Sequence, residues 1–381
     1  MRIERSGQRR SLLTPLVLCT ALLVAACAGG PEKPKPAELG PNAALINVRL
    51  AWSAKAGQVN FPLDVKVTGN TVTLASSDGT VASVDATTGQ DLWRGQVGSP
   101  IEAGAGSDGR IAAVVTLGND LVVLERGREI WREPLGALAY TAPLVAGARV
   151  FVAKADRSVV AFDGQSGRKL WSYARPGEQL LALGQAGALL AVGDTLVVGV
   201  SGRLVGLNPQ NGSVRWEAAI ANPRGTNDVE RLVDIVGRVS REAGVVCARA
   251  FQSAVGCVDA ARGAVLWSKP AVGAQGVHGD GESVFGTESD GKVIAWRRAD
   301  GERVWVSERL KNRGLSAPLA LGQSVAVGDA QGMLHFLSKQ DGTLLARVAT
   351  DGSAIVAAPV LAGNTLVVVT RNGGVFGFRP E

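Results

Sequence analysis

The chain has 381 residues and a formal net charge of +6 at pH 7. Its first 26 residues hold four arginines and one glutamate, so the remainder carries a net charge of only +3. Because this small charge is spread without runs, it argues against a nucleic-acid-binding surface.

The N-terminal segment has the composition of a signal peptide. The apolar run Leu12–Ala26 is shorter than the roughly 20 apolar residues that span a bilayer. It follows a basic stretch that contains Arg2, Arg5, Arg9 and Arg10. We therefore predict that residues 1–26 are removed on export.

The end of this run, Val24-Ala25-Ala26-Cys27, resembles the bacterial lipoprotein box, in which small residues precede a cysteine that receives acyl chains. The resemblance implies that Cys27 carries the lipid anchor, the alternative being an ordinary signal peptide followed by a chance cysteine. Because Ala28 follows and not aspartate, it also implies an outer-membrane location facing the periplasm. We predict that residues 27–44 comprise the acylated cysteine and a flexible, Pro- and Gly-rich tether.

One short pattern then recurs seven times along the chain. A glycine is followed four residues later by tryptophan in six copies, and by alanine in the seventh. The tryptophan position recurs every 38 to 51 residues, a period typical of one four-stranded propeller blade. The pairs are Gly89/Trp93, Gly127/Trp131, Gly167/Trp171, Gly212/Trp216, Gly263/Trp267, Gly301/Trp305 and Gly342/Ala346.

Small residues precede these glycines by six positions in five copies, as expected where sheets approach closely. Leu121 and Phe336 depart from this rule in the second and seventh copies. We expect each tryptophan to cover the neighbouring blade, with roughly 2 to 3 kcal/mol of stabilisation if well buried. The five small residues are Ser83, Ala161, Gly206, Cys257 and Ala295.

The two ends of the repeat region complement each other. The last stretch, "AAPVLAGNTLVVVTRNGGVFGFRPE", supplies three strands and lacks the tryptophan strand. Residues 46–57, "INVRLAWSAKAG", form a tryptophan strand without the preceding three, and Trp52 lies 41 residues before Trp93. Pairing the two would complete an eighth blade and remove open sheet edges. We therefore predict an all-β fold, an eight-bladed β-propeller over residues 45–381.

This repeat, with Asp or Asn at the end of the third strand, the glycine turn and the tryptophan, resembles that of quinoprotein (PQQ) dehydrogenase propellers. Combined with the lipoprotein box, the length and the eight copies, it is most similar to the BamB family, lipoprotein subunits of the outer-membrane β-barrel assembly (BAM) complex. The resemblance implies a non-catalytic scaffold without a cofactor that binds the barrel subunit BamA and assists insertion of outer-membrane proteins. Direct contact with unfolded outer-membrane proteins is left open.

The resemblance also extends to two long stretches between repeats. "LALG" at residues 181–184 is similar to the family's Leu-x-Leu-Arg, and "DVERLVDIV" at 228–236 is similar to Ile-Asp-Arg-Leu-x-Asp-x-Asp. Gly184 and Val236 depart from the family's Arg and second Asp. In the alternative interpretation, both leucines pack against the adjacent blade and the aspartate caps a turn. The residues implied to bind the periplasmic domains of BamA are Leu181, Leu183, Gly184, Arg231 and Asp234.

Two other functions are weighed against the scaffold. A quinoprotein enzyme would carry adjacent bonded cysteines, and this chain has no Cys-Cys pair. His278 and His335 are its only histidines, too few for a His-rich metal site. A lipid-anchored propeller that binds a small ligand should place polar groups on its inner strands, whereas "TAPLVAG", "SAPLALG" and "AAPVLAG" are apolar. The scaffold is therefore favoured over a ligand-binding propeller or a degenerate quinoprotein.

Two cysteines are left once Cys19 is removed with the signal peptide and Cys27 is acylated. Cys247 and Cys257 lie in "VVCARAFQSAVGCVD", two strand-like runs around a turn near Gln252 that would place them opposite each other. Because the periplasm is oxidising, we predict a disulfide between them. The alternative is a pair of buried free thiols.

Overall fold

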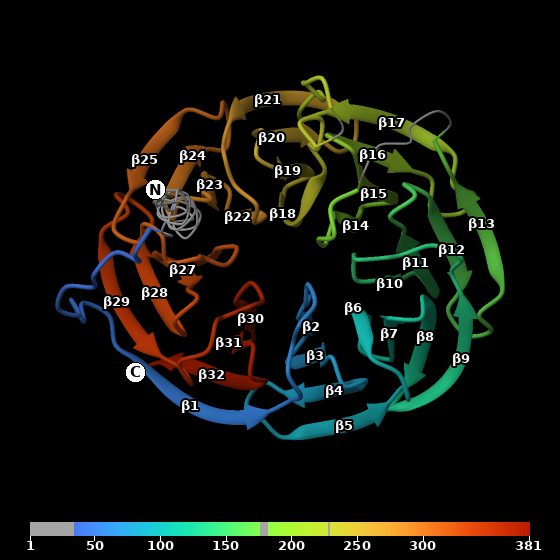
Figure 1. Cartoon of the computed structure of the whole chain (residues 1–381), viewed down its shortest axis with the longest axis horizontal. Coiled ribbons are helices and arrows are strands. Elements are labelled where there is room, and N and C mark those ends of the chain that lie inside the picture. Colours follow the sequence, from blue (N-terminus) through green and yellow to red (C-terminus); the bar gives the residue numbers. More distant parts are fainter. Residues whose placement is uncertain (1–33, 176–181, 228) are drawn as a thin grey trace, which may run out of the picture. The chain divides into compact units, whose positions relative to one another are not determined.

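The computed structural model describes residues 34–175, 182–227 and 229–381. These residues contain strands and turns and no α-helix, hence no helix long and apolar enough to cross a membrane. Ala37–Glu381 form one unit, separate from Met1–Pro36. Within it, eight four-stranded antiparallel sheets follow one another around a ring (Figure 1). The predicted eight-bladed all-β propeller is therefore confirmed.

Each blade is a meander whose first strand lines the centre of the ring and whose last strand lies at the rim. Blade 1 contains β2 (Lys66–Thr68), β3 (Thr71–Ala75), β4 (Thr80–Asp85) and β5 (Asp91–Gln96). Blade 2 contains β6 (Ile101–Ser107), β7 (Ile111–Thr116), β8 (Asp120–Glu125) and β9 (Arg128–Pro134). Blade 3 contains β10 (Leu144–Ala146), β11 (Arg149–Ala153), β12 (Val159–Asp163) and β13 (Lys169–Tyr173). Blade 4 contains β14 (Leu189–Val192), β15 (Thr195–Val200), β16 (Arg203–Leu207) and β17 (Val214–Ala219).

The second half of the ring repeats this order. Blade 5 contains β18 (Ile235–Glu242), β19 (Val245–Ala250), β20 (Ala254–Asp259) and β21 (Ala264–Pro270). Blade 6 contains β22 (Val277–Gly279), β23 (Ser283–Thr287), β24 (Val293–Arg297) and β25 (Arg303–Ser307). Blade 7 contains β26 (Leu319–Leu321), β27 (Ser324–Gly328), β28 (Met333–Ser338) and β29 (Leu344–Ala349). Blade 8 contains β30 (Val360–Ala362), β31 (Thr365–Val369), β32 (Gly374–Pro380) and β1 (Val48–Lys55).

The eighth blade joins the two ends of the chain, as predicted. β1 pairs antiparallel with β32, and Trp52 lies opposite Gly377. The N-terminal blue strand and the C-terminal red strands therefore meet at one place in the ring (Figure 1). Because this pairing satisfies the backbone groups of both strands, neither end leaves an unpaired strand at the closure.

The hydrophobic core lies between neighbouring blades. One cluster, for example, joins Phe151 and Trp171 of blade 3 to Leu196 and Leu207 of blade 4. Corresponding clusters fill the other junctions. Each blade therefore buries its apolar faces only against the blades beside it.

The recurring glycine and tryptophan meet across these junctions. A Cβ on Gly89 of blade 1 would lie 2.5 Å from the Trp52 indole of blade 8, and one on Gly167 would lie 2.8 Å from Trp131. Both glycines also have positive φ, 74° and 73°. The turn therefore requires glycine twice, for its backbone conformation and for contact with the preceding blade's tryptophan.

The indole N–H groups reinforce the same contact. Trp52 Nε1 donates to the Ala86 carbonyl at 2.9 Å, and Trp131 Nε1 donates to that of Gly164 at 3.0 Å. Trp171, Trp267 and Trp305 donate in the same way to Pro209, Arg298 and Lys339. Trp216 is covered by Gly263, but its N–H is buried without a bond.

Blade 7 shows why its tryptophan is missing. Ala346 pairs with Phe336, so the large side chain has moved to the third strand and the small one to the fourth. The next blade is the one closed by the chain ends, and it has no hairpin between its third and fourth strands to cover an indole. Phe336 instead packs in a cluster with Phe378, against which Ile46 is placed.

Blade 2 corrects the predicted alignment. The residue opposite Trp131 is Val123 and not Leu121. The reason is that the hairpin between β8 and β9 has a two-residue loop, Arg126 and Gly127, and is two residues shorter than the corresponding turn of blade 1. The glycine-to-tryptophan spacing is unchanged, so the shortening is hidden in the sequence.

Cys247 and Cys257 lie directly opposite each other on β19 and β20, with Cα atoms 4.0 Å apart and their sulfurs bonded. Cys257 also faces Trp267, the position at which other blades place a small residue. Both cysteines are fully buried. The register that the sequence predicts for this pair is the one observed.

We expect Gly167→Ala to lower the free energy of unfolding by more than Gly193→Ala. Gly193 has a positive φ of 56° with nothing within 4 Å of an added Cβ, so its substitution should cost about 1 to 2 kcal/mol for backbone strain alone. Gly167→Ala adds overpacking against Trp131, about 1 to 3 kcal/mol more. Urea unfolding measures both, and equal costs would show that the indole contact does not matter.

We also expect Cys247 and Cys257 to resist alkylation when the mature protein is denatured without a reductant. Their facing positions allow the bond, and the short loop it closes should give less than the roughly 3 kcal/mol of a 15-residue loop. Intact-mass measurement checks this. Addition of two alkyl groups before reduction would mean that both thiols are free.

Candidate partner-binding surface

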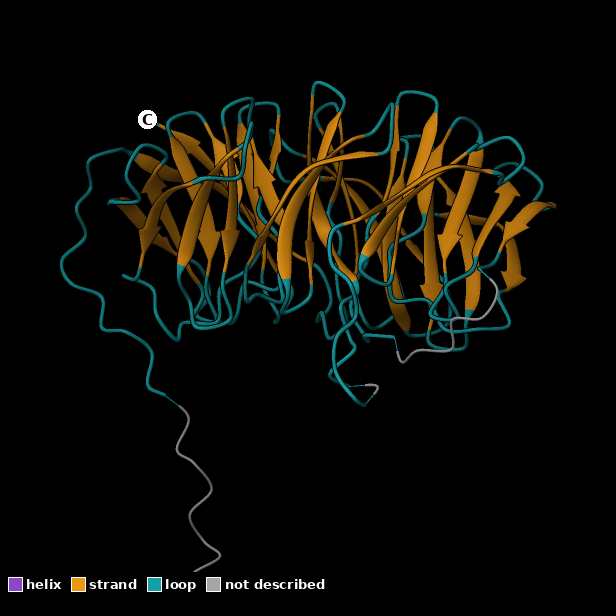
Figure 2. Ribbon diagram, turned by 90° about the horizontal axis from the view of Figure 1, so that it is seen from above, coloured by secondary structure: helices purple, strands orange, loops and turns teal. Residues whose placement is uncertain are grey.

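The two long connections that the sequence singles out lie on one face of the ring. Strand bounds leave residues 174–188 between blades 3 and 4, and residues 220–234 between blades 4 and 5. In a four-stranded meander, the outgoing connection and the second turn lie at the same end of the blade. These connections therefore share a face with the turns after β11, β15 and β19. Figure 2 shows such loops gathered on two opposite faces of the ring.

Asp234 joins several of these segments. One carboxylate oxygen accepts from Arg157 Nη1 at 2.7 Å, and the other accepts from the Leu183 N–H at 2.9 Å. The Asp234 carbonyl accepts from the Phe251 N–H at 2.9 Å. Since both carboxylate oxygens are bonded within the protein, Asp234 acts here as a positioning residue that holds residues 182–187 in place.

Arg157 is a member of this surface that the sequence analysis missed. It lies in the turn between β11 and β12 and its side chain is 7% exposed. It is 77 residues from Asp234 in the chain, and no local motif marks it. Thr141 was missed for the same reason, and its hydroxyl accepts from the Gly187 N–H at 2.8 Å. Only the fold brings these residues together.

The remaining predicted residues differ in exposure. Leu183 is half-buried and Gly184 is exposed. Arg231 is exposed, and its guanidinium forms no ion pair with any residue that the structure describes. Leu181 lies outside the described residues. Val236, which departs from the family's second Asp, is buried opposite Arg249 and so presents no side chain to a partner.

The second connection is shaped by its own side chains. Glu230 accepts from the Thr226 N–H at 2.9 Å, and its own N–H donates to Asn227 at 2.9 Å. The Thr226 N–H, above all, holds the pKa of Glu230 below its usual value. This local network leaves Val229 68% exposed at the tip. The two connections thus leave Val229 and Arg231 exposed and Leu183 half-buried, and Asp234 bonds to the Leu183 N–H.

The central channel is less uniform than the three quoted inner strands predict. β10, β26 and β30 are indeed the innermost strands of their blades, but Asp64, Lys66, Arg238 and Arg241 also line the channel. Arg238 and Arg241 each donate to a backbone carbonyl, of Pro359 and Ala191, at 2.6 Å. These contacts connect blade 5 to blades 8 and 4, so the two guanidiniums have structural partners.

The protein around the channel shifts the pKa values of these groups. Burial lowers the pKa of Arg238 to about 10, which leaves it charged at pH 7. Although the Asp64 side chain faces the open channel, loss of surrounding water raises its pKa. Burial, helped by nearby Arg238, lowers the pKa of His278 to about 3, and its Nδ1 accepts from the Ala320 N–H at 3.1 Å. Among the described residues, no group of His, Cys, Asp and Glu is arranged to hold a metal ion.

Part of the predicted tether is bonded to the ring. The Ala37 N–H donates to the Lys311 carbonyl at 2.9 Å, and Arg313 Nη1 donates to the Ala37 carbonyl at 2.9 Å. Farther along, the Leu45 N–H donates to the Leu345 carbonyl at 2.7 Å. Contacts with the ring are therefore present from Ala37 onward, on the face that carries the two long connections.

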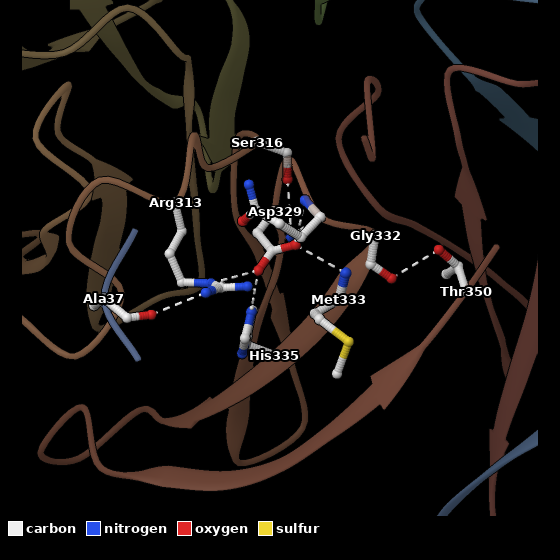
Figure 3. A network of polar contacts seen from close by, with 10 residues as sticks. Ala37, Arg313, Ser316, Asp329, Gly332, Met333, His335 and Thr350 are labelled. Atoms are coloured by element: carbon white, nitrogen blue, oxygen red, sulfur yellow. Dashed lines mark hydrogen bonds and ion pairs between the residues drawn. The ribbon is translucent and has the colours of Figure 1, made fainter. Parts of the chain in front are cut away.

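A buried network holds Arg313 in place (Figure 3). Asp329 Oδ2 lies 2.7 Å from Arg313 Nε and 2.9 Å from His335 Nε2. Burial alone would raise the pKa of Asp329, but hydrogen bonds from His335, the Met333 N–H and Arg313 hold it below its usual value. A charged Asp329 thus pairs with the arginine that binds Ala37.

Comparison with known proteins identifies the family. A family model described as outer membrane protein assembly factor BamB matches residues 77–307. The chain is 38% identical over 372 residues to the outer membrane protein assembly factor BamB of Burkholderia pseudomallei (strain K96243), covering 96% of this chain and 98% of that protein. It is 34% identical to the protein of that name from Bordetella pertussis (strain Tohama I), covering 100% and 99%.

Solved structures agree on the fold. The crystal structure of BamB from Moraxella catarrhalis superposes with a TM-score of 0.79 at 24% identity, covering 87% of this chain and 100% of that one. Quinohemoprotein alcohol dehydrogenase from Comamonas testosteroni gives a TM-score of 0.68 at 15% identity, covering 89% and 78%. At these sequence identities, both similarities support only the propeller fold. On the family match and the two relatives, this chain belongs to the BamB family of outer membrane protein assembly factors.

Proposed function

We propose that this protein is a lipid-anchored, non-catalytic scaffold of the BAM complex that faces the periplasm and assists insertion of outer-membrane proteins. Its relatives are named outer membrane protein assembly factors. The observation that carries the proposal is the pair of long connections held together through Asp234, with Leu183 half-buried on one and Arg231 exposed on the other. Such a prearranged surface suits binding, because little ordering is needed on association.

The partner that we assign to this surface is the periplasmic part of BamA. Leu183 and Val229 offer apolar contact and Arg231 offers a charge without an internal ion-pair partner among the described residues. Arginine is one of the residue types that most often dominate binding energy at protein interfaces. Since Gly184 provides no side chain, the polar part of the contact falls to Arg231.

A ligand-binding function for the central channel is less well supported. Arg238 and Arg241 already bond to backbone carbonyls across the channel. His278 accepts a backbone hydrogen bond, and its low pKa keeps it neutral at pH 7. The hydrogen bonds of these groups connect different blades, so a ligand is not needed to explain why polar residues line the channel.

We expect Leu183→Asp combined with Arg231→Glu to weaken binding of purified BamA periplasmic domains about 30-fold or more, the effect of losing about 2 kcal/mol. The thermal midpoint should change little, because Arg231 is exposed and Leu183 is only half-buried. Biolayer interferometry and thermal unfolding measure the two quantities.

Two further variants give this test its controls. Leu266→Asp changes a more exposed leucine on β21, 48% exposed, and should leave binding unchanged. Asp234→Asn should lower both binding and the thermal midpoint, because it removes the carboxylate charge facing buried Arg157. A double variant that keeps its thermal midpoint and binds with unchanged affinity would contradict the assignment of this surface.

We expect Cys27→Ser to release the protein from the outer membrane into the soluble periplasmic fraction. Several acyl chains at one residue anchor firmly, since each buried methylene contributes about 0.8 kcal/mol. Membrane fractionation and intact mass of the purified protein test this. Continued membrane association of a non-acylated Cys27→Ser protein in cells that lack BamA would contradict the lipid anchor.

A further inference from the structure

Two junctions of the ring depart from the rule that holds at the other six, and the one between blades 1 and 2 does so although its tryptophan is present. At six junctions, a glycine in the hairpin between the third and fourth strands lies against the preceding blade's tryptophan. Hypothetical Cβ atoms on these glycines would approach the indole within 2.8 Å or less. The glycines are Gly89, Gly167, Gly212, Gly263, Gly301 and Gly342.

Trp93 of blade 1 is not covered in this way. The turn that should cover it is the shortened one of blade 2, and a Cβ on Gly127 would meet the backbone carbonyl oxygen of Arg94 at 2.8 Å and not the indole. The short hairpin therefore stops against the backbone of β5. It is two residues too short to reach over the ring of Trp93.

The Trp93 indole N–H is also left without the usual acceptor. At five junctions the indole donates to a backbone carbonyl of the covering turn. Trp93 Nε1 makes no hydrogen bond to any of the residues that the structure describes. One aromatic face and one donor are thus available at the same place.

The missing turn leaves a cleft at this point of the surface. Leu92, Trp93, Arg110, Glu125 and Arg126 line it, and its volume of about 630 Å³ lies within the range of binding pockets. Leu92 is 56% exposed. Arg110 is paired with Glu125 at 2.9 Å, whereas Arg126 is exposed and has no such partner among the described residues. The rim of the cleft is therefore basic.

We propose that this cleft binds a tight, glycine-containing hairpin turn with an acidic residue, presented by a partner protein. The ring itself specifies the chemistry of the occupant. Its own turns set a glycine against the indole and a backbone carbonyl against the indole N–H, and several begin with Asp, as at Asp85 and Asp163. A turn of that kind would fill the vacant position and place its acidic group near Arg126.

This site is separate from the surface assigned to BamA. The cleft is built from the first turn of blade 2, at Gly109 and Arg110, and from its third turn, at Glu125 and Arg126. First and third turns lie at the end of a blade opposite to its outgoing connection. The cleft therefore opens toward the other face of the ring, where a second protein can bind at the same time.

The test uses the full chain labelled with ¹⁵N-tryptophan and a disulfide-cyclised peptide that contains residues 82–92 of this protein, "ASVDATTGQDL". Trp93→Phe assigns the Trp93 indole resonance. We expect peptide up to about 1 mM to shift that resonance saturably and leave the other indole signals in place. Absence of a saturable shift of Trp93 overturns the proposal.

Two variants make the result specific to the cleft. Replacing residues 125–128 by residues 85–90 restores a long turn, which should cover Trp93, slow exchange of its N–H and abolish the peptide shift. Arg126→Glu keeps the short turn and should weaken peptide binding up to about fivefold, the range of one exposed ion pair. An unchanged peptide affinity in Arg126→Glu, or an undiminished shift in a folded turn-replacement variant, would equally overturn the proposal.

Discussion

The contact between a glycine turn and the tryptophan of the preceding blade is the interaction on which the ring depends. A blade of four strands cannot bury either of its faces alone, so it is stable only against neighbours. Glycine permits both the positive φ of the turn and the approach of the indole, and the indole N–H then bonds to the turn backbone. One local motif thus supplies turn geometry and packing at the rim of six junctions, and a directional bond at five of them.

The exceptions to this contact follow from the same constraint. In blade 7, the following blade is completed by the chain ends, so no turn is present to cover an indole, and Ala346 replaces tryptophan. Phe336, buried on the neighbouring strand, supplies part of the lost volume. In blade 2, by contrast, the turn is short and Trp93 is retained, so an aromatic surface is left uncovered.

Much of the fold could be predicted from the sequence because its signals are local. Each glycine followed four residues later by tryptophan predicts one hairpin, and the incomplete repeats at the two ends of the chain predict the closure of the ring. The facing cysteines could be predicted for the same reason, since ten residues around one turn fix their register. The short hairpin of blade 2 could not be predicted because the glycine-to-tryptophan spacing is unchanged, and only strand pairing shows Val123 opposite Trp131.

The partner-binding surface could be predicted only in part, because it depends on contacts between distant residues. The connections were visible as extra length, but the pairing of Asp234 with Arg157 spans 77 residues and follows from the order of the blades. Likewise, the charged groups of the channel come from strands other than the three whose sequences look alike. The repeats therefore allow the architecture to be predicted from the sequence, but they do not reveal the contacts that differ from blade to blade.

Those differences have a role that the repeated contact cannot fill. Because the glycine and tryptophan contact is nearly the same at the six junctions that have it, it does not distinguish the correct neighbouring blade from a wrong one. Charged pairs that occur at one junction only can distinguish the correct neighbour. The buried Arg249 of blade 5, for example, meets Glu288 of blade 6 at 2.8 Å. Lys339 of blade 7 meets Asp280 of blade 6 at 2.6 Å in the same way. A misplaced blade would leave the Arg249 charge buried and unpaired, at a cost of about 3 to 5 kcal/mol, so such pairs penalise misassembly more than they stabilise the correct ring.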